Sequence, residues 1–326
     1  MNILIADKME SECIQGLQNL GCSVQTNPDL GPETLGDALR KTEAEILVVR
    51  STKVPGGAFA GCTTLRGIIR AGAGVDNIDV PAASKAGIAV SNCPGMNSSA
   101  VAELTIGLLI ACDRRIAQQT AELKAGHWNK KEYSKARGLQ GATMLVIGRG
   151  AIGRQVVRRA KAFGMKLLIE EPSLTPQWAE EIGLELIGST KEALHAALAR
   201  ADAVTIHVPL TDTTRGLCNA EFFSHMKRGA IFINTSRGPV VDEAALLDAV
   251  KSKDLRVGLD VYCGQPEGKD CQWKPELAAH PNVITTHHIG ASTDQAQIAV
   301  AEEVVRIVKG YRETGRFENQ VNKASC

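Results

Sequence analysis

The stretch that decides the fold is residues 144–160, M-L-V-I-G-R-G-A-I-G-R-Q-V-V-R-R-A. An apolar run leads into Gly148, Gly150 and Gly153, which have G-x-G-x-x-G spacing, and a helix-forming segment follows. The first glycine permits a tight turn, the second lets the backbone approach a pyrophosphate, and the third lets the helix pack closely on the strand. The helix start offers unpaired N–H groups to the phosphates. Because a strand precedes the motif and a helix follows it, we predict a dinucleotide site here rather than an ordinary loop.

The strand after the glycine motif ends in two acidic residues. Glu170 and Glu171 follow the apolar run K-L-L-I, 17 and 18 residues after Gly153. A carboxylate at this place accepts hydrogen bonds from a ribose diol and repels a 2′-phosphate. The sequence therefore predicts NAD as the cofactor, in preference to NADP, with Glu171 on its ribose.

Strand-length apolar runs alternate with helix-length amphipathic segments along the whole chain. Several runs are continuous in Val, Ile, Leu and Ala, which is typical of parallel strands buried on both faces. This alternation predicts a doubly wound α/β fold. The predicted strands cover residues 2–6, 22–26, 46–49, 67–70, 88–90, 143–148, 166–170, 203–208, 230–235, 257–261 and 283–286.

Two turn-rich breaks, at residues 91–99 and 289–293, divide the chain. Its 326 residues are enough for two domains. We therefore expect a Rossmann NAD-binding domain at 97–288. It is inserted into a second domain formed by 1–96 and 289–326, which the family resemblance described below implies is a flavodoxin-like substrate domain. The two crossings between domains make a hinge, and a ligand is expected in a cleft beside it.

The composition argues against several classes of protein. Lys plus Arg total 37 and Asp plus Glu total 36, and such a balance disfavours nucleic acid as a partner. No apolar run reaches the roughly 20 residues of a membrane span, and the start M-N-I-L-I-A-D-K does not resemble a signal peptide. Nine cysteines without CxxC spacing indicate free thiols in a reducing compartment. We expect a cytoplasmic protein without membrane or nucleic-acid partners and without a metal ion in its site.

Reactive side chains follow three of the predicted strands. Arg237, Gln265 and the pair His287 and His288 each come after a strand end, where open α/β sheets bind ligands. An arginine holds a carboxylate through two parallel hydrogen bonds, and a histidine can take a hydroxyl proton as hydride leaves. These residues suit oxidation of a 2-hydroxy acid. The alternatives are a salt bridge at a helix start and histidines without a chemical role. Since successive strand side chains face opposite ways, only one histidine is expected to face the ligand.

Seven segments together resemble the D-isomer-specific 2-hydroxyacid dehydrogenases, most of all the short phosphoglycerate dehydrogenases without a regulatory domain. The resemblance runs in order over nearly the whole chain. The segments are R-A-G-A-G-V-D-N-I-D (70–79), N-S-S-A-V-A-E-L (97–104), G-R-G-A-I-G (148–153), H-V-P-L-T (207–211), N-T-S-R-G-P-V-V-D-E (234–243), G-L-D-V-Y (258–262) and T-T-H-H-I-G-A-S-T (285–293).

The resemblance implies a role for each matching residue. Arg237 holds the substrate carboxylate and His288 is the acid–base residue, whereas His287 stands where the family often has proline. The implied cofactor-binding residues are Gly148, Gly150, Ala151, Ile152, Gly153, Glu171, His207, Val208, Pro209, Thr235, Ser236 and Asp260. The implied substrate-binding residues are Arg50, Ser51, Lys53, Ala73, Gly74 and Asn97.

One catalytic position departs from the family pattern D-V-x-x-x-E-P, because Gln265 stands where the glutamate belongs. Its carbonyl could accept a hydrogen bond from His288 and orient it. It cannot stabilise an imidazolium by charge, so we expect a lower histidine pKa than beside a carboxylate. Three interpretations remain open. The enzyme works with Gln265 and a shifted pH profile, Glu267 reaches into the site, or rapid turnover has been lost.

The predictions of the substrate and of a partner subunit depend on two basic segments. Arg50 and Lys53 together favour a phosphate, and hence 3-phosphoglycerate, unless both are solvated surface charges. The basic loop at 128–138 resembles a segment of phosphoglycerate dehydrogenases and either meets a partner subunit, in a homodimer or higher oligomer, or is a solvated loop. The enzymatic alternative is a glyoxylate or hydroxypyruvate reductase. The non-enzymatic alternative, favoured by Gln265, is an NAD-sensing protein that binds a partner.

Overall fold

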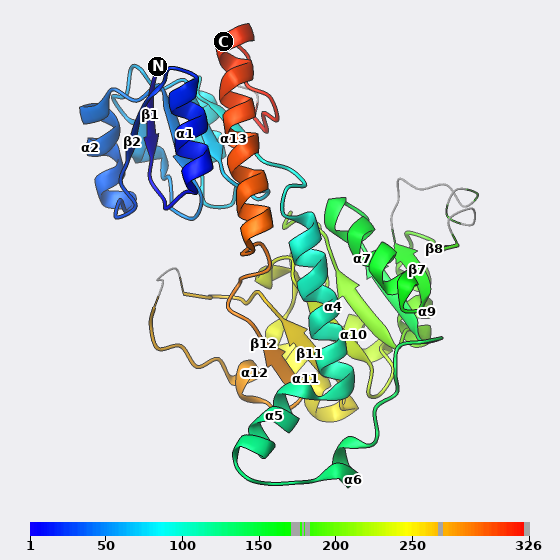
Figure 1. Ribbon diagram of the computed structural model, residues 1–326. Coiled ribbons are helices and arrows are strands. Elements are labelled where there is room, and N and C mark those ends of the chain that lie inside the picture. Colours follow the sequence, from blue (N-terminus) through cyan, green and yellow to red (C-terminus); the bar gives the residue numbers. More distant parts are fainter. Residues whose placement is uncertain (171–176, 178, 180–182, 267–269, 323–326) are drawn as a thin grey trace. The chain divides into compact units, whose positions relative to one another are not determined.

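The computed structural model describes residues 1–170, 177, 179, 183–266 and 270–322. The chain forms two compact units, Met1–Asn97 with Ser292–Cys326, and Ser98–Ala291. These limits lie within three residues of the limits expected from the sequence. Each unit carries its own parallel sheet, as Figure 1 shows. The second unit is thus an insertion into the first.

The sheet of the first unit has five parallel strands in the order β2-β1-β3-β4-β5. This is the order of flavodoxin-like folds, as expected. Its strands are β1 (Asn2–Ile5), β2 (Ser23–Thr26), β3 (Ile46–Val49), β4 (Gly67–Arg70) and β5 (Ala89–Asn92). Its helices are α1 (Ser11–Asn19), α2 (Pro32–Thr42), the 3₁₀ helix η1 (Gly56–Phe59), α3 (Val80–Lys85) and α13 (Asp294–Thr314).

Two apolar clusters cover the two faces of this sheet. Ile3 and Val48 pack with α1 and α13 on one face. Leu4 and Leu47 pack with α2 on the other. Because β3 is buried on both sides, its sequence I-L-V-V is a continuous apolar run. The helix α13, from the end of the chain, therefore completes the core that the first 97 residues begin.

The sheet of the second unit has seven parallel strands in the order β12-β11-β10-β9-β6-β7-β8. Counted from β6, six strands have the order 3-2-1-4-5-6 of dinucleotide-binding domains, and β12 adds a seventh beside β11. Strand order therefore reverses between β6 and β9, where such folds bind their ligands. The strands are β6 (Thr143–Ile147), β7 (Lys166–Glu170), β8 (Glu185–Ile187), β9 (Ala203–Ile206), β10 (Ile231–Asn234), β11 (Arg256–Leu259) and β12 (Val283–Thr285).

Helices cover both faces of this second sheet. Met144 and Val146 of β6 pack beneath α4 and α7, whereas Leu145 and Ile147 pack with α9, α10 and α11. Helices α5 and α6 lie on an extension beyond the sheet (Figure 1). The helices are α4 (Ser98–Arg114), α5 (Ile116–Lys124), α6 (Lys130–Tyr133), α7 (Ala151–Ala162), α9 (Lys191–Arg200), α10 (Ala220–His225), the 3₁₀ helix η2 (Gly238–Val240), α11 (Glu243–Lys253) and α12 (Glu276–Ala279).

All eleven strands expected from the sequence are present, with ends that differ by at most two residues. The prediction missed β8, whose three residues E-L-I at the sheet edge form no long apolar run. Within the described residues, none of the helices combines the length and the hydrophobicity that crossing a membrane requires.

Candidate active site

The glycine turn joins β6 to α7 in the geometry expected from its motif. Gly148 has φ of 86°, and a Cβ there would lie 2.6 Å from the carbonyl oxygen of His207. A Cβ on Gly153 would lie 2.1 Å from the carbonyl oxygen of Gly148, so neither position accepts a side chain. Gly150 caps α7, and a Cβ there would meet no atom within 4 Å. The fold itself thus requires the first and third glycines, and the space beside the second is open for phosphates at the helix start. Ala151 and Ile152 form the first residues of α7, and these residues fit NAD.

The end of β7, the next strand along the chain, packs against this turn. Gly148 N donates a 3.1 Å hydrogen bond to the carbonyl oxygen of Glu170, which ties the end of β7 to the glycines. Glu171, the expected ribose ligand, lies outside the described residues.

His207 follows β9, the strand beside β6. Its Nε2 lies 3.0 Å from Thr205 Oγ1, and burial lowers the pKa of His207 to about 3. The imidazole is therefore neutral near pH 7. The backbone carbonyl oxygen of His207 packs on the glycine turn. After it, Val208 is half-buried and Pro209 is exposed.

The turn after β10 presents Arg237. Asn234, at the end of the strand and 1% exposed, holds this turn with its side-chain amide. Its Oδ1 accepts hydrogen bonds from Ser236 N at 2.9 Å and Ser236 Oγ at 2.8 Å, and its Nδ2 donates to the carbonyl oxygen of Arg237 at 3.0 Å. Arg237 is half-buried and extended, and its Nη1 lies 2.7 Å from the carbonyl oxygen of Ser236. Thr235 is buried with its hydroxyl 2.9 Å from that of Thr105 in α4. The role of Asn234 could not be predicted from the sequence, because it depends on the shape of the turn.

The Arg237 turn packs directly on the loop that follows β11. A Cβ on Gly238 would lie 2.1 Å from the carbonyl group of Tyr262 and 2.5 Å from Cys263 N. Cys263 N donates a 2.7 Å hydrogen bond to Glu243 in α11, whose pKa is raised by burial. The tips of β10 and β11 therefore form one packed unit.

Gln265 joins that loop to the end of β12. Its Oε1 accepts a 3.2 Å hydrogen bond from Tyr262 N, and its Nε2 lies 2.6 Å from His288 Nδ1. Since the carbonyl oxygen is used by Tyr262, the amide NH₂ faces the ring and donates to Nδ1. Nδ1 can accept this hydrogen bond only when it carries no proton. The contact therefore favours the neutral histidine with its proton on Nε2. The orientation expected from the sequence, with the amide carbonyl facing His288, is reversed in the structure.

The backbone around His288 is held by Asp260, which is 2% exposed. Asp260 Oδ1 accepts hydrogen bonds from Thr286 Oγ1 at 2.6 Å and Ile289 N at 2.9 Å, and Oδ2 accepts from Gly290 N at 2.8 Å. His288 has φ of 54°, a left-handed conformation that costs a non-glycine residue about 1 kcal/mol. Asp260 thus fixes the loop from its buried end, and its expected contact with the cofactor stays a prediction.

His287 and His288 lie beyond the last residue of β12, Thr285. The alternation of side chains along a strand therefore does not apply to them. Both are exposed, and His288 is distinguished by its hydrogen bond to Gln265. Glu267, the alternative carboxylate for this site, lies outside the described residues.

In the first unit, Asp7 organises the loop predicted to bind substrate. Its carboxylate accepts hydrogen bonds from Arg50 N at 2.6 Å, Thr52 N at 3.1 Å and Ser51 Oγ at 2.9 Å. Burial alone would raise the pKa of Asp7, but these hydrogen bonds lower it below its ordinary value. Asp7 was not among the predicted site residues, although its position directly after a predicted buried strand was a usable signal.

The cations expected to bind phosphate differ in their surroundings. Arg50 Nη1 lies 3.0 Å from Gln297 Oε1 and 3.7 Å from Glu10 Oε1, so a carboxylate already faces it. Lys53 is exposed. The other expected substrate residues are half-buried in the same unit: Ala73, Gly74 and Asn97.

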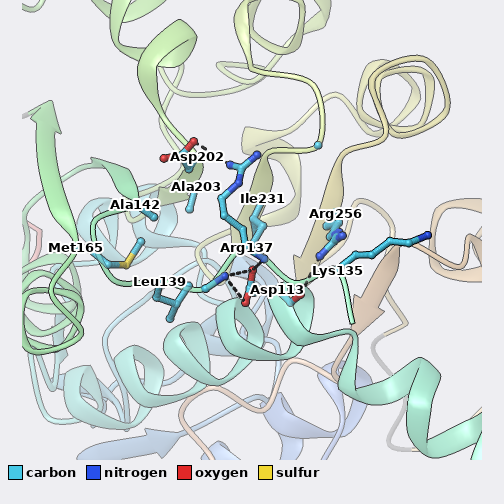
Figure 2. A pocket seen from close by; sticks show the side chains of 12 residues that line it. Asp113, Lys135, Arg137, Leu139, Ala142, Met165, Asp202, Ala203, Ile231 and Arg256 are labelled. Carbon is cyan, nitrogen blue, oxygen red and sulfur yellow. Dashed lines mark hydrogen bonds and ion pairs between the residues drawn. The ribbon is translucent and has the colours of Figure 1, made fainter. Parts of the chain in front are cut away.

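A pocket lies at the opposite edge of the seven-stranded sheet, where the strands begin (Figure 2). Asp113 accepts hydrogen bonds from Arg137 N and Gly138 N, both at 3.2 Å. Arg137 pairs with Asp202 at 2.8 Å, and Arg256 donates to the carbonyl oxygen of Asp113 at 2.8 Å. The charged groups therefore form ion pairs and hydrogen bonds with one another and with the backbone at the end of α4. This arrangement ties the chain before β6 to the sheet, and the candidate active site remains at the other edge.

Comparisons with known proteins agree with this geometry. Residues 106–290 match the family model described as D-isomer specific 2-hydroxyacid dehydrogenase, NAD binding domain. The chain is 42% identical over 316 residues to a D-3-phosphoglycerate dehydrogenase of Methanocaldococcus jannaschii, covering 95% of this chain and 58% of that protein. It is 39% identical to a hydroxypyruvate reductase of Thermotoga maritima, covering 95% of this chain and 97% of that protein. A glyoxylate reductase structure from Paecilomyes thermophila matches with a TM-score of 0.85 and 27% identity, over 100% of this chain and 99% of the other. The chain thus spans little more than half of the phosphoglycerate dehydrogenase.

Proposed function

Because this chain belongs to the D-isomer specific 2-hydroxyacid dehydrogenases, which are NAD-dependent oxidoreductases, we propose that it interconverts a D-2-hydroxy acid and its 2-oxo acid. When bound, NAD supplies the hydride acceptor of this reaction. The observation that carries the proposal is the hydrogen bond between Gln265 and His288 beside the turn of Arg237. An imidazole and a guanidinium on connected strand tips match the proton transfer and the carboxylate of such a substrate.

The chain's own residues divide the work as follows. Arg237 binds the substrate carboxylate. In reduction, the protonated form of His288 gives its Nε2 proton to the oxygen of the 2-oxo group as hydride arrives, which completes the hydroxyl group and leaves a neutral ring. This form carries a proton on Nδ1 as well, so the Gln265 amide must turn its carbonyl oxygen toward the ring. Asp260 and Gln265 fix the position and the tautomer of His288. For oxidation the ring must instead present an unprotonated nitrogen to the hydroxyl group, and the present orientation of Gln265 disfavours that tautomer.

The substrate we favour is the pair 3-phosphoglycerate and 3-phosphohydroxypyruvate. The support is the similarity to the M. jannaschii enzyme and the cations Arg50 and Lys53 after β3. Lys53→Ala should then raise the KM for 3-phosphoglycerate at least about tenfold more than the KM for D-glycerate, because only the former has a phosphate. Equal effects on the two substrates would reject the phosphate contact.

A second candidate substrate is hydroxypyruvate or glyoxylate. The carboxylate of Glu10 beside Arg50 favours it, because a paired guanidinium has less to offer a phosphate. The relative from T. maritima, matched over 97% of its length, carries that name. Comparing kcat/KM for 3-phosphohydroxypyruvate, hydroxypyruvate and glyoxylate with NADH separates the two candidates.

We also propose that the chain forms a homodimer through α5, α6 and the segment between them. No residue of α5 is buried, and Trp128 and Leu123 are 75% and 54% exposed. Such exposed apolar side chains gathered in one segment are typical of an interface. Light scattering after gel filtration should give twice the chain mass for the wild type and the monomer mass for Trp128→Ser combined with Leu123→Ser. A monomeric wild type would reject the dimer.

A further inference from the structure

A group of three metal-ligating side chains lies on α9 and α10, away from the catalytic loops. His195 comes from α9, and Glu221 and His225 come from α10. One ligand atom from each lies within 4.8 Å of the others. Among the described residues, this is the one group of three or more His, Cys, Asp or Glu side chains with such spacing. From this geometry we propose that the chain binds a divalent transition-metal ion, with Zn²⁺ as the best fit, between α9 and α10.

The arrangement of the side chains supports chelation. Glu221 and His225 are separated by one helical turn and share a face of α10. The ring of His195 stacks on that of His225 with centroids 3.8 Å apart and planes at 15°. His195 Nε2 lies 3.9 Å from Glu221 Oε1. In a tetrahedral zinc site, nitrogen and oxygen ligands lie about 3.3 Å from one another, so the ligand atoms need to close by about 1.5 Å at most.

The backbones that carry these ligands are fixed by the core. Leu198 of α9 and Phe222 and Phe223 of α10 are at most 2% exposed. Asn219 caps α10 by accepting a hydrogen bond from Phe222 N at 3.0 Å. Metal binding therefore requires the stacked rings of His195 and His225 to rotate toward one ion, while the core holds the two helix backbones in place.

The donor set selects the class of ion. Two imidazole nitrogens and one carboxylate oxygen suit Zn²⁺, Co²⁺ or Ni²⁺, whereas Mg²⁺ and Ca²⁺ prefer oxygen ligands alone. A solvent molecule would take the fourth position, because Glu221 and His225 are exposed.

Lys191 competes with the ion for the carboxylate. Its Nζ lies 2.5 Å from Glu221 Oε2. Both side chains are largely exposed, so this pair contributes little to stability and a divalent ion can displace it. Removing the Lys191 amine should therefore strengthen metal binding. If the ion bound through the two histidines alone, without Glu221, this change would leave the affinity unaltered.

The experiment is a Zn²⁺ titration of the chelator-treated full chain by calorimetry, with the wild type and five single variants. The wild type should bind one equivalent that His195→Gln, His225→Gln and Glu221→Gln each weaken at least about tenfold. Lys191→Met should bind more tightly than the wild type. His127→Gln is the matched control, since His127 also lies beside a glutamate, Glu122, at 3.4 Å but has no third ligand in this group.

A second readout does not depend on counting equivalents. Zn²⁺ at 100 times its Kd should raise the Tm of the wild type by roughly 4–7 °C and that of His225→Gln by much less. Co²⁺ in place of Zn²⁺ should give a tetrahedral visible spectrum that is lost in His195→Gln. The proposal is overturned if the wild type binds no Zn²⁺, or if its affinity is the same in the two histidine variants as in His127→Gln.

Discussion

Gln265 donates its side-chain amide to His288 Nδ1 across 2.6 Å, while its carbonyl oxygen accepts a hydrogen bond from Tyr262 N. The side chain at position 265 therefore lies between a backbone N–H and a ring nitrogen. A carboxylate there would accept hydrogen bonds from both at once. A glutamine can satisfy both only when the ring nitrogen is unprotonated. The departure at this catalytic position thus acts on the protonation state of the histidine.

Gln265→Glu should shift the pH–rate profile of 2-oxo acid reduction to higher pH by about 1 unit or more, because a carboxylate beside the ring stabilises the imidazolium. The measurement is the initial rate of NADH oxidation between pH 5.5 and pH 9. Gln265→Met is the control, because it keeps the size of the side chain without either charge or amide. If the profiles of Gln265→Glu and the wild type coincide, Gln265 has no part in setting the protonation of His288.

Gly238→Ala tests the packing between the Arg237 turn and the loop after β11. The added Cβ would lie 2.1 Å from the backbone of Tyr262, so the turn must move. We expect kcat/KM to fall at least about tenfold and the free energy of unfolding to fall by roughly 2 kcal/mol. Gly107→Ala in α4 is the control, because a Cβ there meets nothing within 4 Å and should be neutral or stabilising. Wild-type kinetics and stability in Gly238→Ala would contradict the close contact.

His207 should make the stability of the protein without ligand depend on pH. Its pKa is about 3 in the folded state against an ordinary 6.5, so below pH 6.5 the unfolded chain takes up a proton that the folded chain does not. Its contribution is fully present above pH 6.5 and is lost as the pH falls toward 3, at up to about 1.4 kcal/mol per pH unit. Urea unfolding at pH 7 and pH 5 should show a loss of roughly 2 kcal/mol from this group, and a smaller total loss in His207→Asn. The same loss in both proteins would show that His207 is not the group responsible.

Asp7→Asn should loosen residues 50–52. The amide offers one acceptor in place of a carboxylate that accepts from Arg50 N, Thr52 N and Ser51 Oγ, and its NH₂ would face these donors. We expect a loss of about 1–3 kcal/mol in the free energy of unfolding and a rise in substrate KM, with the Kd for NADH unchanged. Ser51→Ala, which removes only the hydroxyl donor, should be milder. A rise in the Kd for NADH instead of the substrate KM would place Asp7 outside the substrate loop.

Local patterns in the sequence predicted most of the framework, and contacts between distant residues account for what was missed. The turn at Gly148 and the apolar strands could be predicted because spacing within a few residues determines them. The roles of Asn234 and Asp260 could not be predicted in this way, because they depend on which backbone N–H groups the folded loops bring to these side chains. The orientation of the Gln265 amide depends on Tyr262 and on a histidine 23 residues away.

The group of metal-ligating side chains on α9 and α10 could not be recognised in the sequence for the same reason. His195 and the pair on α10 are separated by more than twenty residues, and only the packing of α9 on α10 brings them together. The three-residue strand β8 was missed for a simpler reason, since E-L-I carries too little pattern to identify.

The central claim is that Arg237 and His288 together reduce a 2-oxo acid with NADH. The most direct measurement is steady-state kinetics of the wild type, Arg237→Gln and His288→Gln on 3-phosphohydroxypyruvate, hydroxypyruvate and glyoxylate, with the Kd for NADH measured on each protein. We predict that the wild type turns over at least one of these acids. Each variant should lose about 10²–10⁴ of kcat/KM while its Kd for NADH changes little. A wild type that binds NADH but reduces none of the three acids, or variants that retain wild-type kcat/KM, would contradict the account and favour an NAD-sensing role.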